Sequence, residues 1–112
     1  MKKLIWLASS HRRLKDFPDT ARRKAGHELD QVQNGRMPSD WKPMLSIGPG
    51  AVEIRIHDPH EYRVIYVASF KEGIYILHAF AKKTQRTPKR DIELARIAYA
   101  EIKQKRQVNI AE

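Results

Sequence analysis

The chain of 112 residues contains no cysteine, no long hydrophobic run and few acidic residues relative to basic ones. Without cysteine it can form no disulfide, no thiolate metal site and no cysteine nucleophile, so its fold must rest on packing alone. That absence suits a reducing cytoplasm, where we expect the protein to act. The length leaves room for one domain, and we expect residues 1–112 to form it.

Long apolar segments are missing, although apolar residues make up 41% of the chain. No window approaches the roughly 18 consecutive apolar residues of a membrane-spanning helix, so we expect no membrane span, and no membrane is among the partners that we expect. The apolar content also argues against a largely disordered chain. The first apolar run, residues 4–8, is too short for a signal peptide and basic residues follow it, so we interpret it as a strand.

Basic residues are abundant: 22 Lys and Arg face 13 Asp and Glu, which gives a formal net charge of +9. The isoelectric point is about 10.0. This surplus predicts a polyanionic partner, because a basic domain neutralises phosphates and releases their counterions. Nucleic acid fits best, but an anionic lipid surface or an acidic protein would satisfy the same charge balance.

Two helices are predicted before residue 35. Ser9 and Ser10 are possible caps of a short first helix, and Asp16 is a possible N-cap of the second, which ends at Asn34-Gly35. The inward face of the second helix carries small or apolar residues at helical spacing: Ala21, Ala25, Leu29 and Val32. Residues 35–50 contain three prolines and three glycines, so we expect a loop there, pinned to the body by apolar side chains.

Three strands are predicted after this loop, at residues 51–57, 61–69 and 73–81. The first alternates apolar and polar residues, and the other two are dense in β-branched and aromatic residues. Because their connections are short, we expect consecutive antiparallel neighbours. Apolar residues on both faces of the second and third strands indicate central positions in the sheet.

A final helix is predicted to be capped by Thr87 and to start at Pro88, with residues 107–112 frayed. Its apolar arc consists of Ile92, Leu94, Ala95, Ala98, Tyr99 and Ile102. The element order predicts an α+β fold: helices packed on a twisted, mainly antiparallel sheet of about four strands, with a C-terminal helix.

Most catalytic and metal-binding patterns are absent. His57 and His60 flank a turn without two further ligands, and His27 lacks the second histidine of a zinc-binding helix, so we expect no metal and no cofactor. Residues 46–50 lack the strand-to-helix context of a phosphate-binding loop or a nucleophile elbow. His78 lies in an apolar strand, where a histidine is more often a core residue than a catalyst.

Cationic residues remain as candidates, contributed by neighbouring strands and the segment after them: Arg55, Arg63, Lys82, Lys83, Arg86, Lys89 and Arg90. Such a cluster suits cleavage of RNA through its own 2′-oxygen, which needs in-line positioning, stabilised phosphate charge and proton transfer. Arginine can bind a phosphate through two hydrogen bonds. A lysine close to other cations has a lowered pKa and can act as a base. The alternative is a solvated basic surface with no catalytic role.

Four segments carry a resemblance to a known family: residues 40–43, 47–55, 62–66 and 77–95. The last contains the block Phe-x-Lys-Lys-Thr-x-x-Thr-Pro. In these segments, and over almost the whole chain, the sequence closely resembles the phage-derived HigB-like branch of the RelE/ParE toxin superfamily.

The resemblance implies the toxin of a type II toxin–antitoxin pair, with a small α+β, RelE-like fold. Such a toxin enters the ribosomal A site and cleaves mRNA without a metal, as a metal-independent endoribonuclease. The expected partners are mRNA, the ribosome and a cognate helix-turn-helix antitoxin of the HigA-like kind. Operator DNA is expected to bind only through the toxin–antitoxin complex.

The resemblance also implies roles for individual residues. Arg63 matches a strand arginine that acts on the scissile phosphate, Lys83 matches a second cation after the last strand, and Lys82 lies beside it. Lys89 stands near the place of a tyrosine that assists proton transfer in well-known relatives. Glu53 stands where some relatives have lysine, which weakens the analogy at that position.

The general base is left open among Lys82, Lys89 and, less favoured, His78. We expect four further residues to bind RNA: Arg55, Arg86, Arg90 and His78. Two alternatives to the nuclease share the fold: a non-enzymatic gyrase inhibitor like the ParE members, and an inactive phage-associated binding protein.

Overall fold

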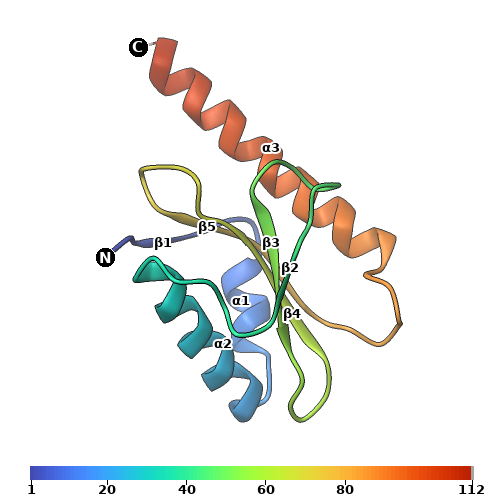
Figure 1. Cartoon of the computed structure of the whole chain (residues 1–112). Coiled ribbons are helices and arrows are strands. Elements are labelled where there is room, and N and C mark those ends of the chain that lie inside the picture. Colours follow the sequence, from blue (N-terminus) through green and yellow to red (C-terminus); the bar gives the residue numbers. More distant parts are fainter. Residues whose placement is uncertain (112) are drawn as a thin grey trace.

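The computed structural model describes the backbone of residues 1–111 and the side chains of residues 1–107. A twisted sheet forms the middle layer, with two helices on one face and the long C-terminal helix on the other (Figure 1). The predicted α+β class is confirmed. None of the helices within residues 1–111 is long and apolar enough to cross a membrane.

The sheet has five strands in the order β1-β5-β4-β3-β2. Their bounds are β1 Leu4–Trp6, β2 Trp41–Pro43, β3 Ala51–Ile56, β4 Tyr62–Val67 and β5 Ile74–Ala81. β1 pairs with β5 in parallel and all other pairs are antiparallel. β4 and β5 are interior strands, as their apolar residues on both faces predict.

The helices are α1 Ser10–Lys15, α2 Asp19–Gln33 and α3 Lys89–Ala111. The four residues predicted for the inward face of α2 are all buried, and so are Ala95, Ala98, Tyr99 and Ile102 of α3. The small alanines allow both helices to lie close against the sheet.

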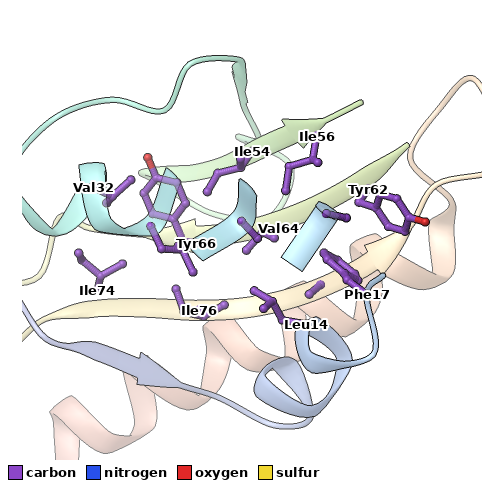
Figure 2. Packing of buried hydrophobic residues seen from close by; sticks show 14 residues of the cluster. Leu14, Phe17, Val32, Ile54, Ile56, Tyr62, Val64, Tyr66, Ile74 and Ile76 are labelled. Atoms are coloured by element: carbon purple, nitrogen blue, oxygen red, sulfur yellow. The ribbon is translucent and has the colours of Figure 1, made fainter. Parts of the chain in front are cut away.

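Alternation along the strands produces two separate cores. Ile54, Val64 and Ile76 point toward α1 and α2, where they pack with side chains such as Leu14 (Figure 2). Their neighbours, among them Ile65, point toward α3. The same alternation places Glu53, Arg55 and Arg63 on the α3 face, at the end of the sheet where α3 begins.

Several predicted boundaries are wrong. The loop at residues 35–50 contains β2, an edge strand that makes five strands of the expected four. Asp16 is the C-cap of α1, whereas the N-cap of α2 is Pro18. The last helix starts at Lys89 and not at Pro88, and the hydroxyl of Thr87, its predicted cap, donates to Glu53. α3 continues to Ala111 through most of the segment expected to fray, and Glu112 lies outside the described residues.

Candidate functional site

Arg63 lies on the central strand β4, and its side chain is 5% exposed. Nη1 donates to the carbonyl oxygen of Tyr62 and Nη2 to Oε1 of Glu61, each over 2.9 Å. Nε lies 3.6 Å from Oε1 of Glu53. The guanidinium is therefore held on three sides, and its orientation is fixed before any ligand binds.

Arg63, Lys82 and Lys83 line one pocket of about 380 Å³, together with Glu61, Thr84 and Gln85. The backbone N–H of Lys82 donates to the carbonyl oxygen of Glu61 over 2.8 Å, which ties the end of β5 to the start of β4. Three of the four residues predicted to be catalytic thus come together. The fourth, Lys89, is exposed at the start of α3 and is not among the lining residues.

Lys82 has a pKa below its ordinary value. Burial is the largest cause and the positive charge of Arg63 is the next, while the carboxylate of Glu53 opposes them. A larger fraction of Lys82 is therefore in the neutral amine form than of a solvated lysine, and a neutral amine can accept a proton.

A second pocket of about 370 Å³ adjoins the first, because Lys82 and Gln85 line both. Arg55 and Arg86, two of the predicted RNA-binding residues, lie in its wall, and so does Lys42. We refer to the two pockets together as the cationic groove. Its cations come from β2, β3, β4 and the segment between β5 and α3: Lys42, Arg55, Arg63, Lys82, Lys83 and Arg86.

The other two predicted RNA-binding residues lie elsewhere. Arg90 lines a separate pocket between α1 and the start of α3, where Lys83 also contributes to the wall. His78 is buried at 3% side-chain exposure, with Nε2 2.7 Å from Oδ1 of Asp91 and its ring stacked on Phe80. Burial lowers the pKa of His78, and the bond to Asp91 opposes that shift.

Two glutamates of the site were not identified from the sequence as functional. Glu53 is 1% exposed and lies between Arg55 and Arg63, and Glu61 binds Arg63 at the mouth of the pocket. No local signal marked Glu53, because it occupies a polar position of the alternating strand β3, which the sequence predicts to face solvent; it is buried because the last helix covers that face of the sheet. A buried carboxylate there needs cationic partners.

His57 lies between two carboxylates that bind opposite edges of its ring. Nε2 contacts Asp40, and Nδ1 lies within 2.9 Å of Glu61. Their hydrogen bonds, with that of Asp40 the stronger, raise the pKa of His57. Among the side chains of residues 1–107, no group of three or more His, Asp or Glu is placed to hold a metal ion.

Comparison with known proteins gives one family. The family model described as "Phage derived protein Gp49-like (DUF891)" matches residues 12–100, which include every residue of the cationic groove. No curated protein matches the chain.

Proposed function

We propose that this chain, which belongs to the Gp49-like family of phage-derived proteins in the RelE-like toxin superfamily, is a toxin that cleaves mRNA on the ribosome. Within that superfamily we assign it to the HigB-like branch of type II toxin–antitoxin toxins. The proposal rests chiefly on the pocket shared by Arg63, Lys82 and Lys83.

The chemistry follows from the placement of these three cations. A phosphodiester in the pocket would replace Glu61 on Nη2 of Arg63, while Glu53 and the carbonyl oxygen of Tyr62 keep the guanidinium oriented, so little further reorganisation accompanies the growing charge on the phosphoryl oxygens. The neutral amine of Lys82 accepts the proton of the 2′-hydroxyl as its oxygen attacks phosphorus. The bond from phosphorus to the 5′-oxygen then breaks, and the protonated amine of Lys83 supplies the proton that this oxygen takes. The products are a 2′,3′-cyclic phosphate and a 5′-hydroxyl.

Lys82 is the preferred base among the three candidates. It lines the same pocket as Arg63, whereas Lys89 is exposed on α3 and His78 is buried against Asp91. The lowered pKa of Lys82 supports the same assignment.

The proposed partners are those that the family resemblance implies, and the positive charge of the groove is compatible with them. mRNA in the ribosomal A site is the proposed substrate, and a cognate HigA-like helix-turn-helix antitoxin is the proposed inhibitor. An acidic segment of that antitoxin would cover the cationic groove, and operator DNA would bind only through the complex. We place the protein in the cytoplasm, where these partners occur.

The test is to add the protein to translating ribosomes and map the 5′ ends of the mRNA. We expect A-site cuts with the wild type and with Lys24→Ala, a control that removes a lysine already paired with Asp58 at 3.1 Å. We expect no cuts with Lys83→Ala. Uncut mRNA together with inhibited gyrase supercoiling would support a ParE-like inhibitor instead. Uncut mRNA and no growth defect on overexpression would leave only an inactive binding protein.

A further inference from the structure

Glu53 is a carboxylate buried to 1% exposure at the end of the sheet where α3 begins. Oε2 accepts a hydrogen bond from the hydroxyl of Thr87 over 2.9 Å. Oε1 lies 3.6 Å from Nε of Arg63 and 3.8 Å from Nε of Arg55. Burying a charged group costs free energy unless neighbouring groups compensate the charge. The cause of the buried position of Glu53 must therefore lie in the residues around it.

That cause lies in the register of β3 and β4. Arg55 and Arg63 are directly opposite each other in the ladder, and like charges in that position destabilise a sheet. Glu53 lies two residues before Arg55 on the same face of β3, so its carboxylate can offset both cations. The Nε atoms of both arginines are buried and have no hydrogen-bond partner within the described part of the chain, and Oε1 of Glu53 is the acidic oxygen that lies beside each of them.

Thr87 connects this cluster to the other wall of the groove. It stands two residues before α3 and lines the second pocket with Arg55 and Arg86. Its bond to Glu53 therefore links the segment that carries Lys82 and Lys83 to the strands that carry the arginines.

We propose that Glu53 is the positioning residue of the cationic groove. Held by Thr87, its carboxylate attracts the Nε–H groups of Arg63 and Arg55 and thereby keeps Nη2 of Arg63, now bonded to Glu61, at the pocket that Lys82 and Lys83 line. This role rests on the proposed function, because the ligand it prepares for is the RNA phosphate. Glu53 does not touch substrate.

The kinetic test removes the negative charge of Glu53 and retains the shape of its side chain. Glu53→Gln keeps an oxygen for Thr87 but loses the attraction to both arginines, so we expect kcat to fall on the order of 10–100-fold through misplacement of the phosphate-binding group. It also removes the anion that opposes the lowered pKa of Lys82, so the rise of rate with pH should move to lower pH. Thr87→Val, which cannot donate to Glu53, should reduce kcat less than Glu53→Gln does. Thr87→Ser, which keeps the hydroxyl, should have the wild-type kcat.

The matched control is Glu93→Gln, which removes a charge from an exposed glutamate paired with Arg96 on α3. It should leave kcat, KM and the pH profile unchanged. A Glu53→Gln protein with the wild-type pH profile and kcat would overturn the positioning role.

A second measurement does not depend on cleavage. The Nε–H signals of Arg55 and Arg63 in ¹H–¹⁵N NMR should exchange slowly with solvent in the wild type and in Glu93→Gln, and faster in Glu53→Gln. Unchanged exchange in Glu53→Gln would contradict the positioning of the arginines. If the wild type cleaves no mRNA while its exchange behaves as expected, the proposed function fails and the role of Glu53 in fixing the arginines stands.

Discussion

Arg63 donates from Nη2 to Oε1 of Glu61 over 2.9 Å, and both residues line the pocket that contains Lys82 and Lys83. Unlike Glu53, Glu61 is 42% exposed at its side chain and also accepts from His57. The bond to His57 is the largest cause, and that to Arg63 the next, of the lowered pKa of Glu61. A phosphate that binds Arg63 needs the donors that Glu61 now occupies, so the carboxylate competes with substrate.

Glu61→Gln should therefore bind RNA more tightly. Removal of the competing charge frees Nη2 of Arg63 and reduces repulsion of the phosphate, so we expect the Kd for a short single-stranded RNA to fall several-fold. Fluorescence anisotropy with a labelled RNA measures this, with Glu93→Gln as the control for loss of one negative charge. Weaker binding of Glu61→Gln would mean that Glu61 orients Arg63 rather than competing for it.

The salt dependence of RNA binding should identify the cations that contact phosphates. Each such contact contributes about 0.7 to the slope of log Kobs against log salt for a single strand, so Lys82→Ala and Lys83→Ala should each reduce the slope by about that amount. Lys24→Ala should leave it unchanged, because Lys24 lies outside the groove and pairs with Asp58. Equal slopes for all three variants would place the RNA elsewhere on the surface.

His78 should make the protein less stable in acid. Because burial lowers the pKa of His78, the unfolded state binds a proton at a higher pH than the folded state does. Stability is then fully present above the unfolded pKa of about 6.5 and falls as the pH drops through the folded pKa, by at most about 1.4 kcal/mol per pH unit.

Urea unfolding between pH 7.5 and about 5 measures this fall. His78→Gln, which keeps a donor for Asp91 but does not titrate, should show a flatter profile over that range. Parallel profiles would contradict the buried neutral state of His78.

Gly48→Ala should destabilise the fold without touching the groove. A Cβ at Gly48 would lie 2.7 Å from Cε2 of Tyr99, whose ring is buried and whose hydroxyl donates to the carbonyl oxygen of Pro49. The ring cannot retreat without losing that bond, so we expect a loss of about 1–3 kcal/mol in the free energy of unfolding. Gly26→Ala is the control, because a Cβ there meets nothing within 4 Å.

The sequence predicted the helices and strands in which a pattern of apolar residues extends over enough positions to be recognised. α2 and α3 repeat apolar residues over several turns, and β3 to β5 show sustained alternation or apolar density. β2 is three exposed residues that include a proline, so no local pattern marks it; only its pairing with β3 makes it a strand. The parallel pairing of β1 with β5 joins segments about 70 residues apart, which local patterns do not encode.

The residues of the candidate site likewise divide into those that the sequence identified and those whose place depends on how the strands pair. Arg63, Lys82 and Lys83 were identified from residue type and from the resemblance, and they share a pocket. The place of Glu53 depends on the pairing of Arg55 with Arg63, which is a property of register. His78 faces α3 because the β4–β5 ladder skips Leu77, an irregularity that strict alternation from Ile76 does not predict.

The most direct test of the account replaces Arg63 with lysine and measures single-turnover cleavage of ribosome-bound mRNA. Arg63→Lys keeps a positive charge beside Glu53 but cannot grip a phosphate by two bonds, so the protein should stay folded. We predict A-site cleavage by the wild type and a rate at least about 100-fold lower for Arg63→Lys, the usual cost of removing an oriented charge-stabilising donor. Cleavage by folded Arg63→Lys at the wild-type rate would contradict the account.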